Sequence, residues 1–230
     1  MSSSNPPWVS AWKKHLDGKE KDPQYNVYAL STLSTEGLPK VRHVIHRDLT
    51  PSNIFVITTD MRMQKSSHLS HNPAMEIAWW LDPAGVQFRI SGKAFPLPNQ
   101  STPEGSTRVE DALRQLRTQG EDSDPSWWEK ERKRVWKEGM SGHLRASFAR
   151  PPPGKPLDEV PEPDTWPTRL DAESDDPDEK KQIEVALKNF ALVAIQVDAF
   201  EYLELAETPN RRTQWTRQDD GSWEERKVAP

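Results

Sequence analysis

Alternating and continuous apolar runs dominate the first half of the chain and predict strands. Residues 25–34 and 40–47 alternate and are rich in β-forming side chains. Residues 54–57 form a continuous apolar run, which is typical of a buried strand. Residues 75–81 and 86–97 are joined by Asp-Pro-Ala-Gly, a turn composition that predicts a hairpin. The first hundred residues are therefore predicted to be mainly β.

Helical spacing appears at the N-terminus and again after the predicted hairpin. Trp8, Trp12 and Leu16 recur four residues apart, so they share one face of a short helix. Asp60 is a candidate N-cap for a helix over residues 61–71. Three more helices are predicted over residues 103–118, 125–138 and 141–148.

The C-terminal third combines a polar loop with a strongly apolar strand. Residues 155–181 are acidic and proline-rich, which predicts a mobile loop. Residues 189–205 contain the strongest apolar run, a core strand, and a closing hairpin is predicted over 211–228. We therefore predict one domain over residues 1–230, with a helical insertion at about 103–150 and a mobile loop at about 155–181.

Composition narrows the classes of function. The 230 residues carry a net charge of −5 and no basic stripe, so nucleic-acid binding is not expected. There is no cysteine, which excludes disulfides and thiolate metal sites. No apolar run approaches the roughly 20 residues that span a bilayer, and the first residues lack an apolar signal core. We expect a cytoplasmic protein without membrane contact.

The strand over residues 40–47 carries the most conspicuous polar chemistry. A period of two places Val41, His43 and Ile45 on one face. Arg42, Val44 and His46 then share the other face, where a cofactor is predicted to meet guanidinium and backbone groups. Basic and hydroxyl side chains recur where neighbouring strands begin and end. This pattern favours a small anionic ligand on the outside of a β-barrel.

A metal site is not predicted from the histidines. His43 and His46 are three residues apart on a strand, so their imidazoles point to opposite faces. His68 and His71 can share a helical face, but no third ligand lies near them in the sequence. A single Arg42 or Lys65 is usually a solvated surface charge, and only the whole set of motifs gives these residues a function.

Five motifs occur in an order that resembles a known family. They are Arg42-His43-Val44 with Thr59-Asp60-Met61-Arg62-Met63-Gln64-Lys65; Gln87-Phe88-Arg89-Ile90-Ser91-Gly92; Arg134-Val135-Trp136 with Ser141; Arg145-Ala146-Ser147-Phe148 with Pro151-Pro152-Pro153-Gly154; and Arg211-Arg212 with the closing Trp223-Glu224-Glu225-Arg226. Together they resemble the pyridoxamine 5′-phosphate oxidase-like FMN-binding split-barrel family, in particular its subfamily with a Thr-Asp-x-Arg-x-x-Lys motif. The resemblance spans nearly the whole chain.

The resemblance implies a six-stranded antiparallel Greek-key split β-barrel with peripheral helices. It also implies FMN bound at the interface of a homodimer. The phosphate would meet Arg42 and Lys65, with Arg62 as a third cation, because phosphate suits guanidinium and ammonium donors. The other implied FMN contacts are His43, Val44 and Ile45 through their backbone, Thr58 and Thr59 through hydroxyl or amide groups, Gln87 from the partner subunit, and Arg212 near the ring.

Two departures from the family pattern concern the substrate. The Arg-x-His motif that grips substrate is absent, since the stretch reads Thr208-Pro209-Asn210-Arg211-Arg212. Arg47 stands where the family has a lysine. We therefore predict an FMN-dependent oxidoreductase of unknown small-molecule substrate and unknown catalytic residues. The alternatives are a flavin-binding carrier or sensor without turnover, and a barrel that binds another cofactor such as haem.

Overall fold

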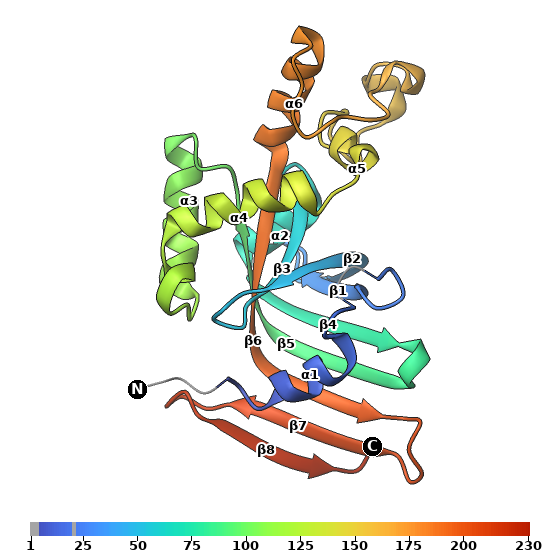
Figure 1. The fold of residues 1–230 in the computed structure, drawn as a ribbon, viewed down its shortest axis with the longest axis vertical. Helices are drawn as coiled ribbons and strands as arrows, with labels where there is room; N and C mark the ends of the chain where they lie inside the picture. Colours follow the sequence, from blue (N-terminus) through green and yellow to red (C-terminus); the bar gives the residue numbers. More distant parts are fainter. Residues whose placement is uncertain (1–4, 20–21) are drawn as a thin grey trace.

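The computed structural model describes residues 5–19 and 22–230, and its centre is an antiparallel sheet that closes on itself (Figure 1). Its strands are β1 (Val27–Leu33), β2 (Pro39–Leu49), β3 (Phe55–Asp60), β4 (Ala74–Leu81), β5 (Val86–Leu97), β6 (Phe190–Glu204), β7 (Arg211–Arg217) and β8 (Trp223–Val228). The order is β3-β2-β1-β4-β5-β6-β7-β8, and β3 also pairs with β6. Six strands, from β3 round to β6, therefore form a closed barrel, and the predicted fold class is confirmed.

Alternation along the strands builds the barrel interior. In β4, Met75, Ile77, Trp79 and Leu81 are buried, while the side chains between them are exposed. Trp79 and Trp80 thus point to opposite faces. β1 begins two residues later than predicted, because Tyr25 forms a turn in which its backbone N–H donates to the carbonyl of Asp22.

Helices cover the barrel on more than one side. They are α1 (Trp8–Leu16), α2 (Gln64–His71), α3 (Pro103–Gln115), α4 (Pro125–Glu138), α5 (Gly142–Ser147) and α6 (Pro177–Asn189), with 3₁₀ turns η1 (Asp82–Ala84), η2 (Gly120–Ser123), η3 (Leu157–Glu159) and η4 (Pro163–Thr165). Trp8, Trp12 and Leu16 are buried, and Trp8 stacks on Phe200 with 5.1 Å between ring centroids. In the described ranges, no helix is both long enough and apolar enough to cross a bilayer.

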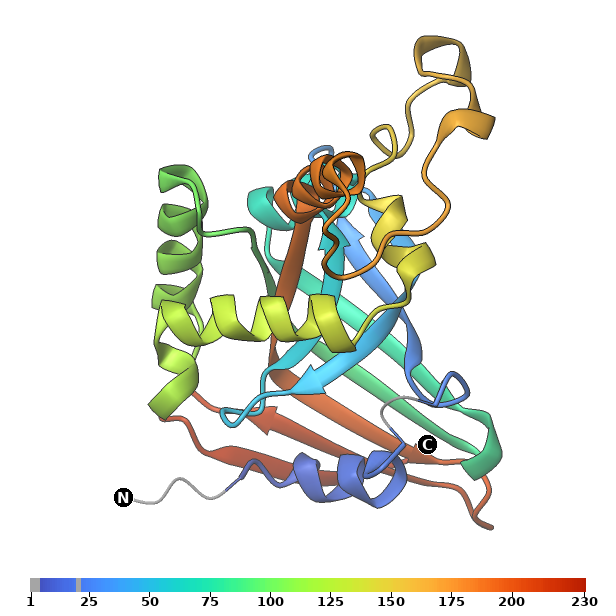
Figure 2. The ribbon, with the colours of Figure 1, turned by 45° about the horizontal axis from the view of Figure 1, so that its top comes forward.

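A second core lies outside the barrel, beneath α3, α4 and α6. Figure 2 shows α3 and α4 on the same side of the sheet. β6 contributes to both cores: Val193 and Ile195 face the barrel interior, while Leu192 and Ala194 face the helices. Burial on both faces explains why this strand reads as a continuous apolar run rather than an alternating one.

Asp60 does not cap α2, contrary to the sequence prediction. The helix begins at Gln64 and its N-cap is Met63, which makes no side-chain capping bond. The Asp60 carboxylate instead accepts hydrogen bonds from the Arg62 backbone, at 2.8 Å, and from the Arg62 guanidinium. At the end of α3, Gln115 is the last helical residue, three before the predicted end.

The predicted loop over residues 155–181 is shorter than expected. Residues 177–181 form the first turn of α6, because the Asp176 carboxylate caps the backbone N–H groups of Asp178 and Glu179. Before it, three carbonyls between residues 167 and 172 accept hydrogen bonds from the Arg150, Arg145 and Trp136 side chains at 2.9, 3.0 and 3.0 Å. We call residues 167–173 the strap. The mobility of residues 155–166 stays a prediction.

Candidate functional site

Two cations from different elements lie together on the inner side of β2. Arg42 lies on β2 and Lys65 on α2, which packs against β1 and β5. The Nη1 of Arg42 donates to Thr32 Oγ1 at 2.7 Å and to the Leu30 carbonyl at 3.2 Å. Thr32 Oγ1 also lies 3.1 Å from Nδ1 of His68, one helical turn after Lys65. We call Thr32, Arg42, Lys65 and His68 the Arg42 cluster.

The electrostatics of the Arg42 cluster favour an anion. Burial, and to a smaller extent the charge of Arg42, lower the pKa of Lys65 to about 8, while Asp60 opposes the effect. Burial also lowers the pKa of Arg42. The Lys65 ammonium makes no hydrogen bond or ion pair within residues 5–19 and 22–230. Two desolvated cations side by side are unfavourable unless an anion offsets their charge.

The donors of Arg62 do not join the cluster. Its guanidinium forms an ion pair with Asp60, with 2.6 Å between Nη2 and Oδ2. Nη2 and Nη1 also donate to the carbonyls of Phe148 and Arg150, at 3.0 and 2.8 Å. Four of its five N–H groups are used in this way. Arg62 therefore connects the end of β3 with the segment after α5, and its predicted contact with the phosphate stays a prediction.

The two threonines of β3 differ in position. Thr59 is buried, donates to the Asp60 carbonyl at 3.1 Å and lies 3.3 Å from the Ser66 hydroxyl on α2. Thr58 is half-buried on the opposite face of the strand. Only Thr59 lies on the same face of β3 as the barrel interior.

The β2 face assignment made from the sequence is confirmed. Val44 and His46 are buried in the barrel, whereas Val41 and His43 are exposed and Ile45 is partly exposed. The predicted backbone contacts of residues 43–45 with a flavin stay a prediction.

A cleft adjoins the C-terminal half of β2. Its volume is about 350 Å³, and it is lined in part by His46, Arg47, Arg134 and Ser141. The Nη1 of Arg47 donates to the Gly139 carbonyl at 2.7 Å and so connects β2 with the end of α4. No member of the Arg42 cluster lines this cleft.

Gln87 and Arg212 lie on the outer face of the sheet, apart from the Arg42 cluster. Gln87 pairs with Leu203, and Leu203 pairs with Arg212, so both polar side chains share one face two strands apart. Gln87 Oε1 accepts from Arg89 at 2.9 Å, and Arg212 donates to Glu201 at 2.7 Å. β5 is three strands from β2 in the sheet order. One chain alone therefore does not bring them to the cluster.

The sequence prediction missed two members of the cluster. His68 had a usable signal, because it is three residues after Lys65 and so shares a helical face with it. Thr32 had none, since its contacts with Arg42 and His68 join residues 10 and 36 positions apart. His68 belongs to no metal-binding group: in the described part of the chain no three His, Asp or Glu residues are arranged to hold an ion.

Comparison with known sequences supports the family resemblance. Residues 5–98 match the family described as pyridoxamine 5′-phosphate oxidase, FMN-binding domain. A pyridoxine/pyridoxamine 5′-phosphate oxidase of Granulibacter bethesdensis (strain ATCC BAA-1260 / CGDNIH1) is 32% identical over 93 residues. That match covers 38% of this chain and 43% of the relative, which is less than half of the relative's length.

Comparison with solved structures concerns the fold. A pyridoxamine 5′-phosphate oxidase-related, FMN binding protein from Nostoc punctiforme PCC 73102 has a TM-score of 0.73 and 22% identity, covering 99% of this chain and 100% of that one. PhzG from Burkholderia lata 383, in complex with tetrahydrophenazine-1-carboxylic acid, has a TM-score of 0.60 and 15% identity over 100% and 95% of the two chains. Residues 5–98 are thus similar in sequence to the pyridoxamine 5′-phosphate oxidase FMN-binding domain, and the chain as a whole shares its fold with these two solved structures.

Proposed function

We propose that this chain binds FMN, with Arg42 and Lys65 at the phosphate, and that it is an FMN-dependent oxidoreductase acting on a small molecule. The observation that carries the proposal is the Lys65 ammonium, which is desolvated beside Arg42 and has no partner among the described residues. A phosphate monoester of about −2 charge supplies the missing partner.

The residues of the Arg42 cluster fit a phosphate in detail. Thr32 and the Leu30 carbonyl hold Nη1 of Arg42, and within the described ranges Nε and Nη2 make no hydrogen bonds. Such a fixed fork suits phosphate oxygens and loses little side-chain entropy on binding. When bound, FMN supplies the hydride and electron transfer, and the chain's residues position it and exclude water.

We further propose that the chain forms a homodimer in which the partner subunit brings Gln87 and Arg212 toward the cofactor. The outer face that carries both residues also exposes apolar side chains: Val41 is 72% exposed, Trp80 44%, Val27 38% and Ile45 37%. The strand register places all four on this same face. Several exposed apolar side chains on one face favour an interface between subunits.

The test of the proposed chemistry begins with reconstitution. Purified protein mixed with FMN should retain about one flavin per chain after gel filtration. NADH or NADPH, added without air, should then bleach the flavin absorbance, and air should restore it. A protein that retains flavin but resists both nucleotides is instead a carrier or sensor. A protein that retains no FMN contradicts the proposal at its base.

The substrate is tested with the compounds named for the Granulibacter relative. Oxygen uptake with pyridoxamine and pyridoxine 5′-phosphates should be slow, because Pro209 and Asn210 stand where the family's substrate-gripping motif belongs. A kcat/KM below about 10⁴ M⁻¹s⁻¹ is expected. Turnover above that range would show that the missing motif does not matter here.

A further inference from the structure

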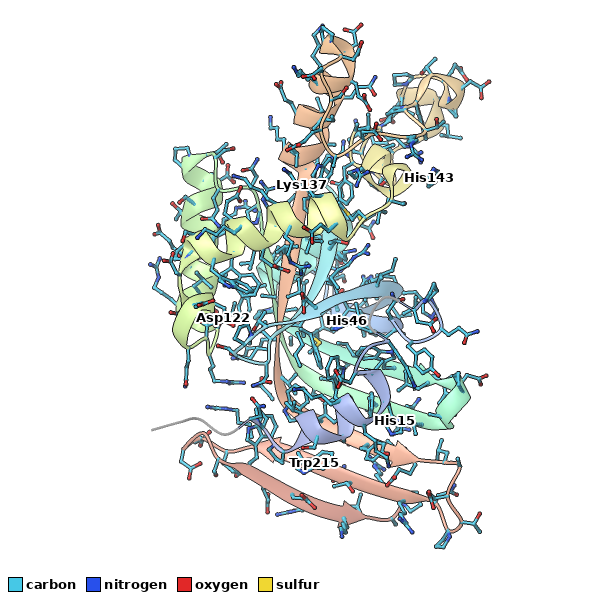
Figure 3. The ribbon with its side chains drawn as sticks, in the orientation of Figure 1. His15, His46, Asp122, Lys137, His143 and Trp215 are labelled. Carbon is cyan, nitrogen blue, oxygen red and sulfur yellow. The ribbon has the colours of Figure 1, made fainter. Side chains whose placement is uncertain are left out.

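A second cleft lies away from the Arg42 cluster. Its volume is about 230 Å³, and no member of the cluster lines it. The turn between β2 and β3, the turn between β7 and β8, and the N-terminal end of α1 approach one another around it (Figures 1 and 2). Buried Asp122 holds the first of these turns, because its carboxylate accepts from the Ser52 hydroxyl and backbone at 2.6 and 3.0 Å (Figure 3).

The lining of this cleft is positively charged. Arg117 and Arg217 line it, and none of its lining residues is acidic. Arg117 is fixed by an ion pair with Asp198 and by a 3.0 Å hydrogen bond from Nη2 to the Val197 carbonyl. Burial and then the charge of Arg117 lower the pKa of Arg217, while Asp198 and Asp220 oppose the effect, so the two guanidinium groups lie close together.

Arg217 lies across the hairpin turn and makes no ion pair within the described ranges, although the charges of Asp198 and Asp220 act on it. Gly221 has a φ of +90°, and a Cβ atom there would lie 3.1 Å from Nη2 of Arg217. The glycine therefore leaves space for the guanidinium across the turn. Asp220 binds the Ser222 backbone and hydroxyl at 2.9 and 2.6 Å. The sole hydrogen bond of the Arg217 guanidinium in the described ranges is a 3.5 Å contact with the Gln218 carbonyl.

Aromatic rings and a free amide donor complete the lining. Trp8 and Trp223 both line the cleft, and their ring centroids are 6.4 Å apart at an interplanar angle of 68°. Gln196 is 2% exposed and also lines the cleft. Its Oε1 accepts from the Arg117 backbone at 2.6 Å, while its Nε2 has no partner within residues 5–19 and 22–230.

We propose that this cleft is a second ligand site, which binds a small planar organic anion independently of the FMN site. The carboxylate or phosphate of the ligand accepts hydrogen bonds from Arg217, Arg117 and Gln196. Its flat apolar body lies against Trp223. The combination of forked cationic donors with an aromatic wall selects both charge and planarity.

Three probes of similar size separate charge from shape in calorimetric titrations of the full chain. Benzoate should bind with a saturable heat. Benzamide, its neutral isostere, should bind at least about tenfold more weakly, because it cannot form charge-assisted hydrogen bonds with the arginines. Cyclohexanecarboxylate, its non-planar analogue, should also bind more weakly than benzoate, because its ring cannot lie flat against Trp223. Equal affinity for benzoate and benzamide would overturn the proposal.

Substitutions then locate the probe. Arg217→Gln should lower the affinity for benzoate at least tenfold. The control is Arg226→Gln, at an exposed arginine of the same hairpin that pairs with Glu224, and it should change this affinity less than twofold. Lys65→Ala should bind benzoate as the wild type does. Benzoate binding that survives Arg217→Gln, or that is lost in Lys65→Ala, would place the probe elsewhere and refute the second site. Unchanged thermal melting of Arg217→Gln establishes that the variant is folded.

Discussion

On the inner face of β2, half-buried Arg42 and buried His46 differ in how their polar atoms are satisfied. Arg42 donates to Thr32 and Leu30, whereas neither ring nitrogen of His46 has a hydrogen bond among the described residues. The His46 ring lies 5.2 Å from that of Trp79 and 5.5 Å from that of Phe55. Burial, with a smaller effect of the Arg47 charge, lowers the pKa of His46 to about 3. This histidine is therefore neutral in the folded protein.

His46 should make stability fall in mild acid. In the unfolded chain its pKa is about 6.5, so below that pH unfolding takes up a proton that the folded state excludes. The free energy of unfolding should drop by about 2 kcal/mol between pH 7 and pH 5 from this group alone. Urea unfolding at pH 7 and pH 5 should show that His46→Leu removes this part of the fall in the free energy of unfolding. His71→Leu, at an exposed histidine, should leave the pH dependence of the free energy of unfolding as in the wild type. An equal pH dependence in both variants would contradict the assignment of this effect to His46.

Arg62 offers a second prediction for a single residue. Its partner Asp60 has a side chain only 4% exposed, so removing the guanidinium leaves a nearly buried carboxylate unpaired. Arg62→Ala should lower the free energy of unfolding by about 3 kcal/mol. Arg226→Ala breaks an exposed pair with Glu224 and should cost less than about 1 kcal/mol. Denaturant unfolding of both variants decides the point, and equal losses would show that Arg62 is an ordinary surface charge.

Local pattern predicted which face each of these residues occupies, but not what it binds. Alternation alone placed Arg42, Val44 and His46 together on β2. The Thr-Asp-x-Arg-x-x-Lys motif singled out Arg62. Two of the acceptors of Arg62, however, are the carbonyls of Phe148 and Arg150, which lie 86 and 88 positions after it in the sequence. No spacing rule relates residues that far apart. The sequence alone therefore does not distinguish an arginine that bonds a distant loop from one that binds phosphate.

Among the secondary-structure elements, periodic segments were predicted well, whereas the loop predicted over the acidic segment is shorter in the structure. The predicted helix over residues 125–138 coincides with α4, and the predicted closing hairpin over residues 211–228 coincides with β7 and β8. Composition suggested that residues 155–181 lack order. The strap is nevertheless held by side chains of α4, α5 and Arg150 that donate to its carbonyls. Long-range backbone acceptors of this kind leave no trace in composition.

The strap predicts where the chain is cut by a protease. Carbonyls of residues 167–173 accept these hydrogen bonds from distant side chains, whereas those of residues 155–166 accept none of them. Leu157, in this second segment, is 65% exposed. Brief digestion with subtilisin should cut within residues 155–166 and spare residues 167–181. Mass spectrometry of the fragments identifies the bonds. First cleavage within the strap would show that these hydrogen bonds do not hold it.

For the whole molecule, the proposed dimer explains the apolar outer face of the barrel. Val41→Glu would bury an unpaired charge at that interface and should weaken association by about 3 kcal/mol, roughly a hundredfold in the dissociation constant. Val185 on α6 is also exposed, at 48%, but lies outside that face, so Val185→Glu is the control and should leave the dimer intact. Analytical ultracentrifugation across a dilution series measures both. A wild-type monomer at micromolar concentration would contradict the shared site.

The most direct measurement of the central claim compares FMN with riboflavin, which lacks the phosphate. Lys65→Ala should lower the affinity for FMN at least tenfold, because it removes one charge-assisted contact that contributes about 1.5–3 kcal/mol. The affinity for riboflavin should stay unchanged. Lys93→Ala, at an exposed lysine of β5, should alter neither. Flavin fluorescence titration gives all six dissociation constants. If Lys65→Ala lowers both affinities equally, or leaves FMN within twofold of the wild type, the Arg42 cluster is not the phosphate site.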